Sequence, residues 1–134
     1  MYNVFVTRKL PGQGLERLRP LCNVTINPED RNITKEELLA ILPEQDALIS
    51  MLSDPIDSEV IEAGSKLKVI ANYAVGFNNI DVAAASKQDI VVCNTPDVLT
   101  NASADFAWAL LMSTARRVVE GDAMTRSGQF TGWA

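Results

Sequence analysis

The chain has 134 residues, of which 47% are hydrophobic and 22% charged, which is typical of one globular domain. The net charge of −5 disfavours binding to nucleic acid or anionic membranes, because both depend on clustered Lys and Arg. No apolar run approaches the ~18 residues needed to span a bilayer, and the amino-terminal residues lack the basic flank of a signal peptide. We therefore expect a cytoplasmic protein without nucleic-acid or membrane partners.

Short apolar runs rich in β-branched residues alternate with helical segments along the chain. This alternation predicts a parallel sheet covered on both faces. The predicted strands are residues 3–7, 23–26, 47–51, 68–72 and 90–93. We expect a flavodoxin-like, doubly wound α/β fold with five parallel strands in the order 2-1-3-4-5.

Four short helices are predicted between these strands from local capping patterns. Thr34 and Glu37 fit a capping box, and Asp57 can cap a helix that ends at Gly64. The other two helices are residues 14–19, ended by Pro20, and one with Asp81 in its first turn.

A longer helix is predicted over residues 101–120, followed by a flexible tail over residues 121–134. Its apolar residues spread around most of the circumference, so the helix should be buried against more than one neighbour. These residues are Phe106, Trp108, Leu110, Leu111, Met112, Val118 and Val119. The predicted organisation is a domain over residues 1–99, this helix over residues 100–120, and the tail.

Cys22 and Cys93 fall on strands at opposite edges of the predicted sheet, so both should be free thiols. Neither has metal-ligand spacing, and the chain contains no histidine. We expect no metal site.

The turn after the fourth strand, around Val75 and Gly76, is the leading candidate for a binding site. Gly76 has no Cβ to block a ligand, and a helix starting near residues 79–81 would direct unpaired N–H groups at the turn. A small carboxylate could be held there by backbone groups. The alternative is an ordinary βα turn in which glycine only permits the backbone path.

Three stretches together resemble the NAD(P)-dependent D-2-hydroxyacid dehydrogenases, most closely their glyoxylate and hydroxypyruvate reductase branch. The resemblance extends from the first strand to Trp133. It rests on Asn72-Tyr73-Ala74-Val75-Gly76-Phe77-Asn78-Asn79-Ile80-Asp81, on Val91-Val92-Cys93-Asn94-Thr95-Pro96-Asp97 and on Thr100-Asn101-Ala102-Ser103-Ala104-Asp105.

The resemblance implies that the N–H groups of Val75 and Gly76 hold the carboxylate of a small 2-oxo acid such as glyoxylate. It makes Leu52 and Ser53 a wall of the substrate pocket, although Ser53 could simply begin a turn before a proline. Asp54 and Asp57 are interpreted as solvated caps.

The same resemblance places Ser103, with Thr100 one turn earlier, near the nicotinamide of NAD or NADP. Capping of the long helix by Thr100 or Asn101 is the alternative role.

The family also carries a G-x-G-x-x-G fingerprint, followed by a catalytic arginine, acidic residue and histidine. This sequence lacks the fingerprint with those residues after it, and it contains no histidine. We therefore expect the substrate-binding domain of a dehydrogenase, inactive alone, whose nucleotide-binding domain is missing. The resemblance implies that helix 101–120 bridges to that domain and forms a homodimer. An engineered truncation, a natural short gene and a proteolytic product stay open as origins.

A competing interpretation is a stand-alone, non-catalytic binding or signalling module of flavodoxin-like fold. A receiver module would need an acidic cluster after the first strand, where this chain has Thr7-Arg8-Lys9. A flavodoxin would need a Ser- and Thr-rich phosphate loop there, and Arg8-Lys9-Leu10-Pro11 does not supply one.

Overall fold

The computed structural model describes residues 1–133 and divides the chain into two compact units. The first is Met1–Pro96, and the second begins at Asp97. The predicted tail ends at residue 134, which lies outside the described residues. Each unit is considered by itself below.

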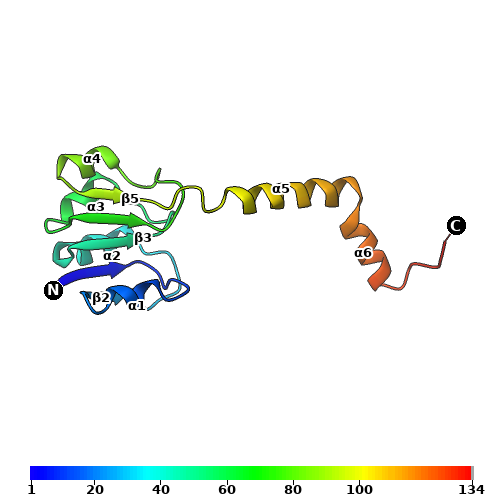
Figure 1. Cartoon of the computed structure of the whole chain (residues 1–134), viewed down its shortest axis with the longest axis horizontal. Coiled ribbons are helices and arrows are strands. Elements are labelled where there is room, and N and C mark those ends of the chain that lie inside the picture. The colour runs from blue at the N-terminus through cyan, green and yellow to red at the C-terminus, as the bar shows by residue number, and fades with distance from the viewer. Residues whose placement is uncertain (134) are drawn as a thin grey trace. The chain divides into compact units, whose positions relative to one another are not determined.

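The first unit is built on a five-stranded parallel sheet in the order β2-β1-β3-β4-β5 (Figure 1). The strands are β1 (Tyr2–Val6), β2 (Cys22–Ile26), β3 (Ala47–Ser50), β4 (Val69–Asn72) and β5 (Val91–Cys93). The predicted strand order and parallel pairing are confirmed, with strand ends shifted by one residue.

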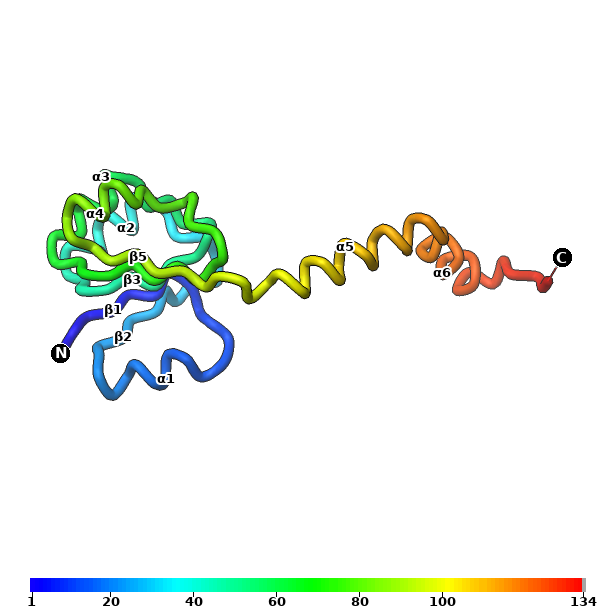
Figure 2. Tube along the Cα trace, turned by 45° about the horizontal axis from the view of Figure 1, so that its top comes forward, coloured from blue at the N-terminus to red at the C-terminus, as the bar shows by residue number. Residues whose placement is uncertain are grey.

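Helices cover the two faces of this sheet unequally. The helices are α1 (Gly14–Leu18), α2 (Lys35–Ile41) with the short 3-10 helix η1 (Leu42–Glu44), α3 (Ser58–Ala63) and α4 (Val82–Lys87). Figure 2 shows α2, α3 and α4 on one face and α1 on the other. The fold is therefore doubly wound, as predicted.

The predicted caps of α2 and α3 are present. The Glu37 amide donates to Thr34 Oγ1 at 3.3 Å, and the Thr34 amide donates to Glu37 Oε2 at 2.8 Å, which completes the capping box. The carboxylate of Asp57 accepts from the amide of Val60 at 3.1 Å. These caps satisfy helical N–H groups that have no partner within the helix.

The hydrophobic core lies between the sheet and helices α2, α3 and α4. Leu48 on β3 and Ile70 on β4 point into it and are fully buried, together with Leu38, Leu42 and Ile61 from the helices. Each such side chain contributes about 1.5–3 kcal/mol by burial. This layer holds the strand ends, and hence the loops that follow them, in place.

Cys22 lies on β2 and Cys93 on β5, the two edge strands, and both are free thiols as predicted. Within residues 1–133, no three His, Cys, Asp or Glu side chains gather as metal ligands would. None of the described helices has both the length and the apolar character that crossing a membrane requires.

The second unit contains two helices, α5 (Thr100–Ala115) and α6 (Val118–Arg126). The prediction of a single helix that ends at residue 120 is wrong, because α5 ends at Ala115 and α6 extends into the segment predicted as a tail. Arg117 adopts a left-handed conformation with φ of 52°, and its amide donates to the Thr114 carbonyl at 3.2 Å, which ends α5.

The start of α5 also differs from expectation. Its N-cap is Leu99, and no side chain caps it, so capping by Thr100 or Asn101, the alternative role for these residues, is wrong. Thr100 is already the first helical residue, and its amide donates to the Asp97 carbonyl at 3.3 Å.

Candidate functional site

Two loops lie side by side at the carboxyl edge of the sheet, because β3 and β4 are adjacent parallel strands. The first loop, residues 51–57, follows β3, and the second loop, residues 73–81, follows β4. They pair through Ile56 and Ile80. The Ile56 amide donates to the Asn79 carbonyl, and the Asp81 amide donates to the Ile56 carbonyl, both at 2.9 Å. Ligands of open α/β sheets bind at this edge.

Three successive carbonyl oxygens of the second loop each accept a hydrogen bond from a donor elsewhere in the first unit. The pairs are Ala74 with the Thr95 amide at 2.9 Å, Val75 with Asn94 Nδ2 at 2.8 Å, and Gly76 with Asn72 Nδ2 at 2.9 Å. In a planar trans peptide, the carbonyl and the next N–H point in opposite directions. These bonds therefore fix the directions of the Val75, Gly76 and Phe77 N–H groups.

The N–H groups of Val75 and Gly76 make no hydrogen bond within residues 1–133. Val75 is 36% exposed, so a ligand in solution can reach this part of the loop. Unpaired backbone donors in succession are a favourable site for an anion. The arrangement can bind a carboxylate without any charged side chain.

The prediction that the start of a helix directs unpaired N–H groups at this site is wrong. Helix α4 begins at Val82, beyond the extended pairing of Ile80 with Ile56. Asp81 is its N-cap and not a first-turn residue, and its carboxylate accepts from the Ala84 amide at 2.9 Å. The helix start is therefore already capped by a negative group, and the candidate donors are loop amides alone.

Leu52 of the first loop lies beside Gly76 of the second. A Cβ added to Gly76 would lie 3.6 Å from Leu52 Cδ1 and 3.2 Å from Asn78 Oδ1. The structure thus brings together two of the predicted site residues. Gly76 does not have positive φ, so glycine matters here for space and not for backbone conformation.

Ser53, the other predicted residue of the first loop, makes a different contact. Its Oγ donates to Asn32 Oδ1 at 3.1 Å. Ser53 and Leu52 both line an open depression of about 490 Å³, together with Asn78 and Asn79. Ser53 therefore contributes to the rim, while Leu52 reaches the glycine.

Asp54 and Asp57 do not share one role. Asp54 is only 1% exposed and accepts from the Met51 amide at 2.7 Å, so the interpretation as a solvated cap is wrong for this residue. Asp57 does cap α3, and Lys35 lies 2.5 Å from its Oδ2. Hydrogen bonds from Lys35 and from the Val60 amide hold the pKa of Asp57 below its usual value.

Three asparagines at this edge were missed by the sequence interpretation. Asn72 and Asn94 donate to loop carbonyls, as described above, and Asn79 Nδ2 donates to the carbonyls of Met51 and Asp54 at 3.1 Å each. A polar residue that ends an apolar strand, as Asn72 does, is the signal that could have drawn attention to them.

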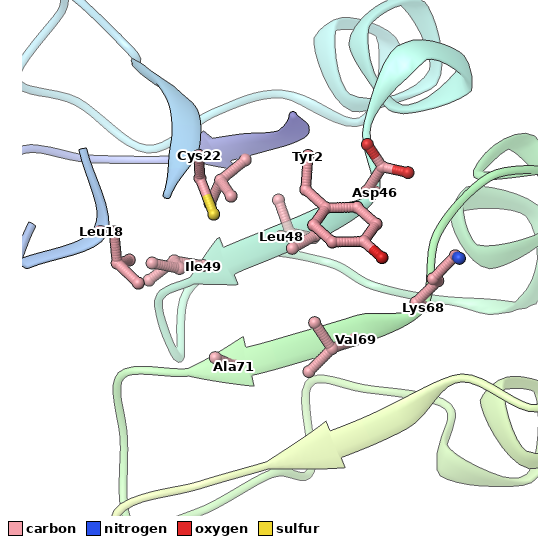
Figure 3. A pocket seen from close by; sticks show the side chains of 11 residues that line it. Tyr2, Leu18, Cys22, Asp46, Leu48, Ile49, Lys68, Val69 and Ala71 are labelled. Carbon is pink, nitrogen blue, oxygen red and sulfur yellow. The ribbon is translucent and has the colours of Figure 1, made fainter. Parts of the chain in front are cut away.

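A separate hollow of about 360 Å³ lies on the sheet face that carries α1 (Figure 3). Its lining is almost entirely apolar, and the charged side chains of Asp46 and Lys68 lie at one end beside Tyr2. The Lys68 ammonium is 5.5 Å from the centre of the Tyr2 ring. A hollow without convergent donors does not suit a small carboxylate, so we do not place the candidate site there.

Thr100 and Ser103, the predicted cofactor residues, lie on the first turn of α5 in the second unit. Both are exposed, and their hydroxyl groups make no hydrogen bond to the described residues. No strand within residues 1–133 is followed by a G-x-G-x-x-G turn, which would hold the pyrophosphate of a dinucleotide. The residues present therefore do not form a complete NAD(P) site.

Sequence comparison relates nearly the whole chain to one protein family. Residues 4–131 match the family described as D-isomer specific 2-hydroxyacid dehydrogenase, catalytic domain. The chain is 53% identical to a glyoxylate reductase of Thermococcus kodakarensis and 50% identical to one of Pyrococcus furiosus. Each alignment covers 95% of this chain and 38% of the relative. The chain thus spans about two fifths of the length of these relatives.

Solved structures give the same relationship. The crystal structure of the TT0316 protein from Thermus thermophilus aligns with a TM-score of 0.87 and 42% identity, over 98% of this chain and 42% of that one. The NAD+-bound 3-phosphoglycerate dehydrogenase of Entamoeba histolytica aligns with a TM-score of 0.69 and 26% identity, over 84% and 38%. From its sequence and its fold, the chain belongs to the family of D-isomer specific 2-hydroxyacid dehydrogenases.

Proposed function

We propose that this chain binds the carboxylate of a small 2-oxo acid such as glyoxylate or hydroxypyruvate, as the substrate-binding part of an NAD(P)-dependent 2-hydroxyacid dehydrogenase. The N–H groups of Val75 and Gly76 would hold the carboxylate. Leu52 would form the apolar wall beside the substrate, and Ser53 its polar rim.

The observation that carries this proposal is the orientation of the second loop. The carbonyls of Ala74 and Val75 are bound by donors from the β5 side, so the Val75 and Gly76 N–H groups point the other way and lack partners within residues 1–133. A carboxylate has two oxygens, each of which can accept from one of these groups. The relatives named glyoxylate reductase support the choice of a small 2-oxo acid.

In the complete enzyme, a nicotinamide would supply or accept the hydride at C2 of the acid. Thr100 and Ser103 are the residues of this chain that we place near the nicotinamide end. Residues 1–99 would form the substrate-binding domain, and residues 100–120 would lead to the nucleotide-binding domain. The chain's own contribution is to bind and orient the carboxylate.

Titration of the 134-residue chain with glyoxylate, followed by amide chemical shifts in NMR, tests this function. The shifts of Val75 and Gly76 should move together and saturate in the millimolar range, because a few exposed contacts supply roughly −4 kcal/mol. Ethylene glycol, which lacks the carboxylate, is the matched control and should leave both amides unmoved. Glyoxylate shifts confined to other loops would refute the assignment.

A further inference from the structure

The side chain of Asn72 ends β4 in a buried position, at 2% exposure. Its Oδ1 accepts from Ser50 Oγ at 2.9 Å. Its Nδ2 donates to the Gly76 carbonyl at 2.9 Å and to Asn79 Oδ1 at 3.0 Å. The carboxamide therefore has partners on both atoms, and these partners fix its orientation.

The side chain of Asn79 continues this network into the first loop. Its Nδ2 donates to the carbonyls of Met51 and Asp54, at 3.1 Å each. These two carbonyls flank Leu52 and Ser53 in the chain. One asparagine of the second loop thus holds the segment of the first loop that carries the proposed pocket wall.

From this geometry we propose that Asn72 and Asn79 are positioning residues, which hold the first and second loops as one rigid unit. Asn72 holds the carbonyl of Gly76, and Asn79 holds the two carbonyls around Leu52. The pair would thereby set the distance between the carboxylate donors and the apolar wall. The consequence for ligand binding rests on the proposed function, whereas the coupling of the loops does not.

A residue that merely stabilises the fold would lower the free energy of unfolding without changing the properties of the folded loops. A positioning residue also changes the order of both loops in the folded state, and the affinity of the site they form. The test therefore needs folded-state readouts. We choose backbone order parameters and glyoxylate affinity.

The main variant is Asn79→Ala in the 134-residue chain, which removes the side-chain bonds from the second loop to the carbonyls of the first loop and to Asn72. Asn23→Ala is the control, because Asn23 is an exposed asparagine on β2 that donates to Asn3 Oδ1 at 3.1 Å. Ser50→Ala is a milder second variant, which removes only the Oγ donor to Asn72. It provides a folded chain for the test if Asn79→Ala does not fold. NMR relaxation of the free chain and glyoxylate titration are measured for all of them.

Asn79→Ala should lower the order parameters of residues 51–55 and 73–79 together, from about 0.85 to below 0.6. It should also weaken glyoxylate binding about fivefold or more, because bonds that fix the loop are lost. Ser50→Ala should act in the same direction with a smaller effect, and Asn23→Ala should leave both readouts unchanged.

Unchanged order in both loops, or loss of order in only one of them, would overturn the inference. A chain that binds no glyoxylate at Val75 and Gly76 would instead refute the proposed function. In that case the relaxation data still decide whether the two asparagines couple the loops. The relaxation data and the titration therefore distinguish failure of the loop coupling from failure of the proposed function.

Discussion

Asn94 Nδ2 donates to the carbonyl oxygen of Val75 at 2.8 Å, which joins the end of β5 to the loop after β4. The bond leaves the peptide between Val75 and Gly76 with its N–H group facing away from Asn94. The side chain of Asn94 thus sets the direction of one of the proposed carboxylate donors, the Gly76 N–H group.

Replacing Asn94 with alanine should weaken glyoxylate binding to the chain about three- to tenfold, because the lost hydrogen bond frees the peptide to rotate. The folded state should change little, since Asn94 is at most partly buried and only one bond is lost. NMR titration measures the affinity, and Asn23→Ala serves as a control because Asn23 is an exposed asparagine on β2. Equal affinities for the wild type and Asn94→Ala would show that this bond does not orient the donor.

Gly76→Ala should abolish detectable glyoxylate binding while changing the free energy of unfolding by less than about 1 kcal/mol. The added Cβ would lie 3.2 Å from Oδ1 of the exposed Asn78, whose side chain can move aside, and in ordinary contact with Leu52 Cδ1 at 3.6 Å. The backbone conformation at this position accepts alanine. Gly14→Ala is the matched control, because a Cβ there meets nothing within 4 Å. Urea unfolding and NMR titration measure the two effects. Binding retained at wild-type affinity by Gly76→Ala would contradict the proposed ligand position.

The purified 134-residue chain should show no glyoxylate or hydroxypyruvate reductase turnover with NADH or NADPH. It contains no histidine to act as the general acid, and a general acid alone typically contributes about 10²- to 10⁴-fold in rate. The assay follows the near-ultraviolet absorbance of the reduced nicotinamide, which is lost when the cofactor is oxidised. A full-length relative is the positive control, and turnover by the rigorously purified chain would prove the expectation wrong.

The chain should form a homodimer at micromolar concentration through α5. Phe106 and Trp108 are each 65% exposed, and Leu110, Leu111 and Met112 are half exposed or more. Burial would contribute about 1.5–3 kcal/mol for each large side chain. Sedimentation equilibrium should show a dimer for the wild type and a monomer for Trp108→Glu, whereas Asp105→Asn on the same helix should remain dimeric. A monomeric wild type would contradict the prediction that a second copy of the chain covers α5.

Acid should destabilise the first unit partly through Glu37. Hydrogen bonds from Arg31 and from the Thr34 amide lower the pKa of Glu37 to about 2, from 4.5. Because the folded-state pKa is depressed, the stabilisation is present above pH 4.5 and is lost as the pH falls towards 2. Glu37→Gln should therefore unfold at lower urea than the wild type at pH 7, with a smaller difference at a pH of about 2.5.

The exposed Glu62 on α3 provides the control for this titration, as Glu62→Gln. High salt should reduce the effect of Glu37, because the ion pair with Arg31 is exposed to solvent. A difference between Glu37→Gln and the wild type that stays constant over the whole range from neutral to acid pH would contradict the assigned cause.

The sequence by itself determined the order of elements and most of the local caps. Strands such as residues 68–72 are short β-branched runs, and the capping box of Thr34 and Glu37 involves groups only three residues apart. The right-handed crossover rule and the alternation of elements then left few arrangements of the sheet. Patterns of this kind depend on neighbours along the chain, so the sequence displays them directly.

Only the tertiary structure decided how the candidate site is held. Asn79 lies 28 residues from Met51, and Asn94 lies 19 residues from Val75. Such bonds exist because parallel strands bring loops from different segments to one edge, and no local pattern marks them. The burial of Asp54, the start of α4 at Val82 and the left-handed Arg117 were missed for the same reason: each depends on contacts or backbone geometry that propensities do not specify.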